Sequence, residues 1–216
     1  AARGVMQTIV DQNEVRLSRA VIRVYPHRDM QALEGLLKQC GHARRRIIIT
    51  DGVFSMDGDL APLPDLAALS NRYDATLIVD DAHGTGALGP TGRGTLEHFG
   101  LAGRPDIIVM ATLGKALGSF GACIAGSREL REYLINRARS FIFTTALPPA
   151  AAAAALEALL IVDDEPELRS QLAGNADFMR EGLSARGFNT LDSSTQIIPL
   201  LIGEPEKAVA MAHRLF

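Results

Sequence analysis

Short apolar runs alternate with longer amphipathic stretches along most of the chain. The runs are rich in β-branched residues and too short for helices, which is typical of buried strands. They lie at residues 21–24, 46–50, 76–80, 106–111, 121–126 and 196–203. Between them, the stretches 30–40 and 62–74 repeat leucine at helical spacing. This alternation predicts an α/β fold with a largely parallel sheet and helices on both faces.

The second half of the chain has a different pattern. Residues 148–166 and 167–187 predict two long helices, joined near Glu165 and Pro166. We therefore expect a large domain over residues 1–163, incomplete at its N-terminus, and the truncated start of a small α+β domain over 164–216. The chain has no initial methionine, and "EKAVAMAHRLF" stops within a helical pattern. It is expected to be an internal piece of a longer protein.

Composition narrows the classes of partner. The formal charge of −3 is spread along the chain, and Arg44–Arg46 is the one basic cluster, so no nucleic-acid partner is expected. The longest apolar stretch, 146–162, contains two prolines and falls short of the roughly 20 residues that span a bilayer, so no membrane association is expected. The two cysteines, Cys40 and Cys123, are far apart, which argues against a disulfide scaffold or a zinc site and favours the cytoplasm.

Polar, glycine-rich loops follow the predicted strands. In open α/β sheets, ligands bind beyond the carboxyl ends of the strands, where the loops are free to carry polar groups. Four loops are candidates: "TDGVFSMDGD" (50–59), "DDAHGTGALGPTGRG" (80–94), "TLGKALGSFG" (112–121) and "FIFTTALPP" (141–149). Together they predict a site at one edge of the sheet.

The residue types in these loops suit pyridoxal phosphate (PLP). This cofactor needs a lysine that forms an imine with it, and a carboxylate that keeps its pyridine nitrogen protonated. Lys115 lies in a glycine-flanked loop, and Asp80 ends a buried strand. Thr112 can donate a hydrogen bond to the phosphate. His83 and Ser55 can hydrogen-bond the phenolic oxygen of the ring or a substrate carbonyl.

Two hypotheses from other classes stay open at this point. Hard cations favour clustered carboxylates, so an α/β phosphohydrolase could bind Mg²⁺ or Mn²⁺. Its ligands would be Asp57, Asp59, Asp80, Asp81 and His83. That reading leaves Lys115 without a role. The third hypothesis is a non-catalytic partner subunit that keeps the fold and donates an interface.

Four segments, in this order and spacing, carry a family resemblance: "DGVFSMDGDLAPL", "VDDAHGTGALGPTGRG", "TLGKALGSFGA" and "FIFTTALPPA". Over residues 5–216 the chain resembles the α-oxoamine synthases, fold-type-I PLP enzymes. The resemblance implies a PLP-dependent acyltransferase that condenses an amino acid with an acyl thioester and releases carbon dioxide. The loops are most similar to those of the member that uses L-alanine and pimeloyl-CoA or pimeloyl-ACP in biotin biosynthesis. Other members make 2-amino-3-ketobutyrate, 5-aminolevulinate or 3-ketosphinganine.

The resemblance also implies residue roles. Lys115 is the Schiff-base lysine, Asp80 the partner of the pyridine nitrogen, and Thr112 a phosphate ligand. His83 and Ser55 lie near the phenolic oxygen. The same family pattern implies a homodimer with shared active sites, in which Thr144 and Thr145 reach the partner's cofactor phosphate.

Three parts of the family pattern have no counterpart in this sequence. The ring-stacking histidine would fall near Met6, where the sequence has none. The upstream glycine-rich phosphate loop is missing. The arginine that holds the amino-acid carboxylate would lie beyond Phe216.

Overall fold

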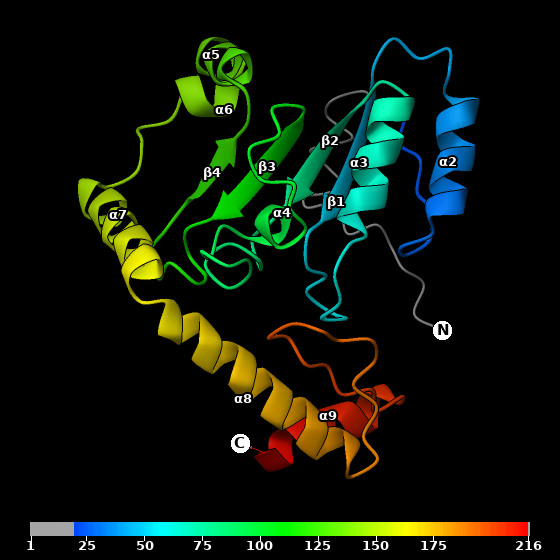
Figure 1. Cartoon of the computed structure of the whole chain (residues 1–216), viewed down its shortest axis with the longest axis vertical. Helices are drawn as coiled ribbons and strands as arrows, with labels where there is room; N and C mark the ends of the chain where they lie inside the picture. Colours follow the sequence, from blue (N-terminus) through cyan, green and yellow to red (C-terminus); the bar gives the residue numbers. More distant parts are fainter. Residues whose placement is uncertain (1–19, 216) are drawn as a thin grey trace.

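The computed structural model describes residues 20–215, which form a four-stranded sheet flanked by helices (Figure 1). The strands are β1 (Arg46–Asp51), β2 (Ala75–Asp80), β3 (Ile107–Thr112) and β4 (Ala122–Ala125), and they lie in this order across the sheet. β1, β2 and β3 are parallel, whereas β4 is antiparallel to β3. The strands predicted from 46, 76, 106 and 121 onward are confirmed, but the last of them, β4, is exposed along its length rather than buried. The expectation about Met6 concerns a position outside the described residues.

The core lies between the sheet and two helices that the leucine spacing predicted. Alternate residues of the parallel strands, among them Ile48, Leu77 and Ile107, are buried on one face of the sheet. Helix α3 (Leu63–Arg72) packs against β2, and α2 (Met30–Gln39) packs against α3. Burial of these leucine-rich faces therefore fixes the strands whose ends carry the candidate loops.

The antiparallel β4 follows from the short connection before it. Only residues 113–121 link β3 to β4, and a parallel crossover needs about a dozen residues or more. After β4 the chain forms α5 (Arg128–Arg137) and α6 (Arg139–Ile142). Ser127 caps α5 by accepting a hydrogen bond from the backbone N–H of Leu130. The short connection 113–121 brings Lys115 to the same sheet edge as the loop after β2.

The C-terminal third is helical. Figure 1 shows α7 (Pro149–Asp164) leaving the sheet beyond β4, and α8 (Pro166–Ser184) leading away to α9 (Pro205–Leu215). The two predicted long helices and their junction are confirmed. In the described part of the chain, every helix is too short or too polar to cross a bilayer.

Two predicted strands are wrong. Residues 21–24 have no regular structure, and Val21 and Val24 are 77% and 58% exposed, so no neighbouring layer buries this run. Residues 196–203 are also irregular. Pro199 interrupts that run and lacks the N–H that a strand ladder needs, although Leu201 donates a backbone hydrogen bond to Asn189. Apolar composition alone therefore overestimated the number of strands.

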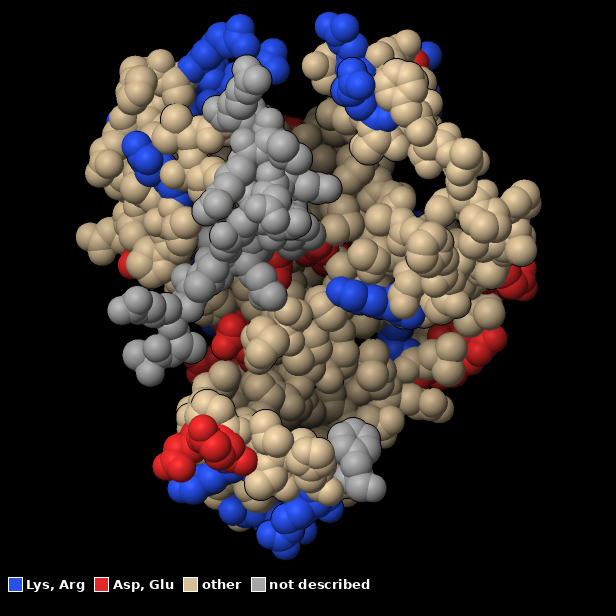
Figure 2. Space-filling view, turned by 180° about the vertical axis from the view of Figure 1, so that it is seen from behind, with Lys and Arg blue, Asp and Glu red and all other residues tan. Residues whose placement is uncertain are grey.

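Charged side chains are mixed over the surface. On the face shown in Figure 2, basic groups lie along the upper edge, near the centre and at the bottom, whereas acidic groups lie at the right edge, at the lower left and near the centre. This arrangement agrees with the small net charge of −3 and contains no broad field of one sign on this face.

Candidate active site

Lys115 and His83 meet at the carboxyl edge of the sheet. His83 comes three residues after Asp80, the last residue of β2, and Lys115 comes three residues after Thr112, the last residue of β3. The Lys115 Nζ atom lies 2.7 Å from His83 Nε2, which is a hydrogen-bond distance. The structure therefore brings these two predicted residues into direct contact.

The Asp80 carboxylate interacts electrostatically with both Lys115 and His83. Burial raises the pKa of Asp80, while the Ala82 N–H and the charges of Lys115 and His83 oppose that rise. The Ala82 N–H donates to Asp80 Oδ1 over 2.6 Å. The pKa of His83 is lowered, first by burial and then by the Lys115 charge. A neutral His83 ring can accept a hydrogen bond from the Lys115 ammonium group.

A second buried carboxylate, Asp51, lies beside Asp80 and was missed from the sequence. Asp51 is the last residue of β1 and is the register partner of Asp80 on β2. Burial, and then the charge of Asp80, raise its pKa to about 7, although the Lys115 charge lowers it. Among residues 20–215, Asp51 Oδ1 has no hydrogen-bond partner. The site thus holds two adjacent carboxylates, of which Asp51 keeps its proton up to neutral pH.

Because the Asp51 carboxyl group is buried, we expect its ionisation to destabilise the folded protein as the pH rises, and we expect Asp51→Asn to remove this effect. Above about pH 4 the unfolded chain has lost the Asp51 proton, whereas the folded protein keeps it up to about pH 7. Wild-type stability from this group should therefore fall as the pH rises through that window, by roughly 4 kcal/mol for a pKa change from 3.8 to about 7. Urea unfolding of the cofactor-free full-length protein at pH 5 to 8 should show the variant gaining on the wild type as pH rises.

The matched control is Asp192→Asn, because Asp192 is an exposed aspartate on the connection between α8 and α9. It should leave the difference from the wild type nearly constant over the same pH range. An Asp51→Asn curve that runs parallel to the wild-type curve would contradict the proton assignment.

Asp81 has a structural role at this edge. Its side chain is almost fully buried, and it accepts hydrogen bonds from the backbone N–H and the hydroxyl of Thr95 and from the hydroxyl of Thr85. Thr95 begins the short helix α4 (Thr95–His98). Asp81 therefore closes the loop 81–95, which carries His83.

Glycines make room for the Asp81 carboxylate. A Cβ atom at Gly84 or Gly94 would collide with its oxygens, and one at Gly52 would come within 2.8 Å of Oδ1. Gly94 also has a φ of +90°, a left-handed conformation that favours glycine. The three glycines thus fit around one buried acid.

The other predicted site residues are less closely connected. Thr112 lies at the end of β3, and its hydroxyl is buried without a hydrogen-bond partner in the described chain. Ser55 is half-buried in the loop after β1, and Thr144 and Thr145 are exposed between α6 and α7. Within residues 20–215, no hydrogen bond or ion pair joins these last three to Lys115 or His83. Their cofactor roles stay predictions.

The structure divides the acidic residues that the metal hypothesis grouped together. Within the described ranges, His27, Asp57 and Asp59 form one group whose ligand atoms lie within 4.8 Å of one another. Asp59 already accepts hydrogen bonds from His27 at 2.8 Å and from Arg28 at 2.9 Å. Asp80, Asp81 and His83 are not members of this group. The five proposed ligands therefore do not converge on one cation.

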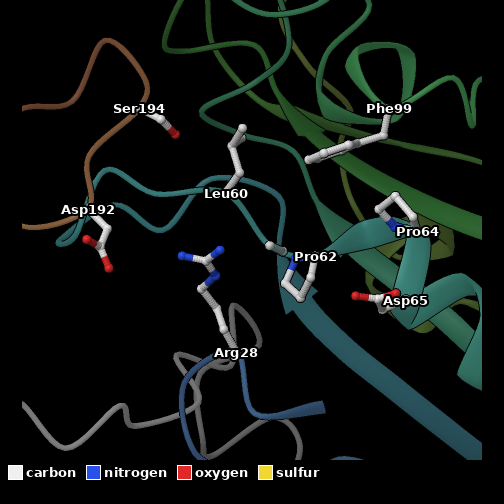
Figure 3. A pocket seen from close by; sticks show the side chains of 9 residues that line it. Arg28, Leu60, Pro62, Pro64, Asp65, Phe99, Asp192 and Ser194 are labelled. Atoms are coloured by element: carbon white, nitrogen blue, oxygen red, sulfur yellow. The ribbon is translucent and has the colours of Figure 1, made fainter.

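A separate hollow of about 630 Å³ lies beside the connection from β1 to α3. Figure 3 shows Arg28, Leu60 and Asp192 around it. Arg28, its central cation, already donates a hydrogen bond to Asp59. None of the predicted site residues lines this hollow, so the Lys115 site is a different place.

Comparison with known proteins decides the family. The model of the family "Aminotransferase class I and II" matches residues 12–216. The chain belongs to this family. A related protein of the family, 8-amino-7-oxononanoate synthase of Geobacter sulfurreducens, is 57% identical over 202 residues, which cover 92% of this chain and 51% of the relative. The protein of the same name in Thermoanaerobacter pseudethanolicus is 46% identical over 232 residues, covering 100% of this chain and 58% of the relative.

Solved structures agree with this result. Serine palmitoyltransferase from S. paucimobilis, solved with PLP and myriocin bound, is 31% identical and has a TM-score of 0.79 over 86% of this chain and 48% of its own. The 8-amino-7-oxononanoate synthase of Francisella tularensis is 31% identical, with a TM-score of 0.77 over 94% of this chain and 59% of its own. These matches confirm the α-oxoamine synthase resemblance and the fold-type-I fold class. The chain spans about half the length of the curated relatives it matches.

Proposed function

We propose that the full-length protein is a PLP-dependent acyltransferase that condenses L-alanine with a pimeloyl thioester, the reaction expected of an 8-amino-7-oxononanoate synthase in biotin biosynthesis. One structural observation carries the proposal: Lys115, His83 and Asp80 gather at the carboxyl edge of the sheet, with Lys115 Nζ 2.7 Å from His83 Nε2. The names of relatives that are 46–57% identical support this choice within the family.

The residues present fit this cofactor. Lys115 is exposed, so its amine is accessible for a covalent bond. Asp80 is a buried carboxylate at a strand end, which suits a cationic ring nitrogen. The buried Thr112 hydroxyl has no partner in the described chain and can donate to a phosphate oxygen. When bound, PLP supplies a conjugated ring that accepts electrons from the substrate's α-carbon.

Each residue has a role in this proposal. Lys115 would hold the cofactor through Nζ and, once released, accept the α-proton of the amino acid at the same atom. Neutral His83 would orient Nζ and hydrogen-bond a substrate carbonyl. Asp80 would keep a positive charge on the ring nitrogen. Ser55 would support the phenolic oxygen from the neighbouring loop.

The test is a turnover assay of the full-length protein with paired substrates. L-alanine with pimeloyl-CoA or pimeloyl-ACP should give a kcat/KM at least about 10-fold above that of glycine with acetyl-CoA, because one methyl group in a fitted pocket discriminates to about that degree. A preference for glycine and acetyl-CoA would instead identify a 2-amino-3-ketobutyrate CoA ligase. A colourless protein with metal-dependent phosphatase activity would overturn the whole class.

We also propose a homodimer whose two active sites are shared. Phe141 and Phe143 are 60% and 74% exposed, next to Thr144 and Thr145. Exposed aromatic groups of this size suit a buried contact with a second copy. Hydroxyls just before the 16-residue helix α7 suit the cofactor phosphate of that copy.

Mixed dimers test the shared site. A Lys115→Ala subunit and a Thr144→Ala/Thr145→Ala subunit should each be inactive alone. Mixing them should restore up to about a quarter of wild-type activity, because half of the dimers are mixed and each mixed dimer has one site with both intact parts. Recovery should be measured after subunit exchange, with mixed dimers confirmed by differently tagged subunits. Mixed dimers that form but recover no activity would contradict the arrangement.

Two further expectations belong to this proposal. We propose that residues 1–163 form the large PLP-binding domain and that 164–216 begin the small domain, supported by the junction between α7 and α8. We also propose a cytoplasmic location, supported by Cys40 and Cys123, which are both free thiols.

A further inference from the structure

A segment far along the chain contacts two of the site loops. Residues 193–197, named here the polar strap, lie between α8 and α9. The Thr195 hydroxyl donates to the carbonyl of Gly58 over 2.8 Å, and the Ser194 N–H donates to the same oxygen over 3.1 Å. The Gln196 side chain donates from Nε2 to the carbonyl of His83 over 2.7 Å. The polar strap thus bridges the loop after β1 and the loop after β2.

The polar strap is packed closely against the first of these loops. Thr195 is 3% exposed. A Cβ atom at Gly58 would collide with the carbonyl of Ile197, and Gly58 has a φ of +68°. Figure 3 shows the segment at Ser194 passing beside Leu60 of the same loop. The absence of a side chain at Gly58 is therefore what permits this approach.

The polar strap is also tied to α8. Arg180 of α8 donates from Nη2 to the carbonyl of Thr195 over 2.6 Å, and from Nη1 to Asp177 on its own helix over 2.7 Å. The position of α8 is thereby linked to the polar strap, and through it to both site loops.

Gln196 is the member of the polar strap that acts on the Lys115 site. It binds the backbone of His83, the residue whose ring contacts Lys115 Nζ. Its other amide atom, Oε1, is buried and has no hydrogen-bond partner in the described chain. A buried amide oxygen without a partner costs stability, and the hydrogen bond from Nε2 to the His83 carbonyl is the contact that holds this side chain in place.

We propose that Gln196 is a positioning residue for His83. By holding the His83 carbonyl, it keeps the imidazole within hydrogen-bond distance of Lys115 Nζ and couples that distance to the placement of α8. The catalytic meaning of this coupling rests on the proposed function, whereas the coupling itself is a property of the chain alone.

The test measures the reactivity of the His83 ring. Full-length protein without cofactor is treated with diethyl pyrocarbonate, and modification of the peptide that contains His83 is followed by mass spectrometry. In Gln196→Met the ring should react about 3- to 10-fold faster, the factor expected when one hydrogen bond is lost. Thr195→Val is the matched control, since it removes a bond of the polar strap to Gly58 and leaves the bond to His83; its rate should stay within about 2-fold of wild type.

Thermal midpoints separate positioning from general loosening. Both variants should lose stability, but only Gln196→Met should expose the His83 ring. Equal acceleration in the two variants, or none in Gln196→Met, would overturn the proposal. If the methionine variant does not fold, Gln196→Asn removes the same bond with a shorter amide and carries the same expectation. The readout needs no turnover, so an inactive wild type would refute the proposed reaction without deciding this point.

Discussion

Lys115→Ala should reduce turnover of the full-length protein by at least about 10⁴-fold and abolish covalent retention of PLP. In the proposed function the primary amine would be both the attachment point of the cofactor and the group that takes the α-proton, and proton transfer alone is worth about 10²–10⁴-fold. Borohydride reduction followed by mass spectrometry would show whether PLP stays attached to the protein.

The matched control is Lys207→Ala. Lys207 is an exposed lysine on α9 that forms an ion pair with Glu204, far along the chain from the sheet edge. It should keep wild-type turnover and covalent PLP. Wild-type activity in Lys115→Ala would refute the role of this residue.

Asp80→Asn should slow the exchange of the alanine α-proton by about 10²–10³-fold while PLP still binds. The variant keeps the shape of the side chain but removes the negative charge that would stabilise a protonated ring nitrogen, and loss of one such electrostatic partner has effects of this size. Exchange in deuterated water, followed by NMR, isolates this step from the attack on the thioester.

Asp106→Asn is the control for this charge. Asp106 precedes β3 at the opposite end of the strand and pairs with Arg104 at the surface. Its removal should leave the exchange rate unchanged. An unchanged rate in Asp80→Asn as well would show that the site does not depend on a carboxylate at this position.

The three parallel strands could be predicted from the sequence because they are buried on a face that the β-branched pattern reveals. Ile48, Leu77 and Ile107 lie in the core, as their runs predicted. The prediction failed at 21–24 and 196–203, where apolar residues are present but no strand pairs with them. Helix α5 was also missed, although Leu130, Tyr133 and Leu134 repeat at helical spacing within it; none of its residues is buried.

The sequence indicated which residues gather at the candidate site but not which of them contact one another. Asp80, His83 and Lys115 follow strands that the pattern located, so their convergence could be expected from the edge rule for parallel sheets. Asp51 was missed because Asp51-Gly52 has the form of a turn, and its pairing with Asp80 depends on strand register. The available signal was that Asp51 follows the apolar run 46–50 in the same way that Asp80 ends the run 76–80. The contact of Gln196 with His83 spans 113 positions, which no local pattern encodes.

The glycines around Asp81 have a consequence for mutational scanning. Every side chain added at Gly84 or Gly94 would displace the carboxylate that closes the His83 loop, so even alanine should score there like a loss of catalysis. A scan that ranks positions by lost fitness would place these glycines beside Lys115. The positions of this loop that tolerate no substitution would then include those that surround a buried carboxylate. Structural and catalytic positions would be distinguished only when the amount of folded protein and the amount of product are measured in the same cells.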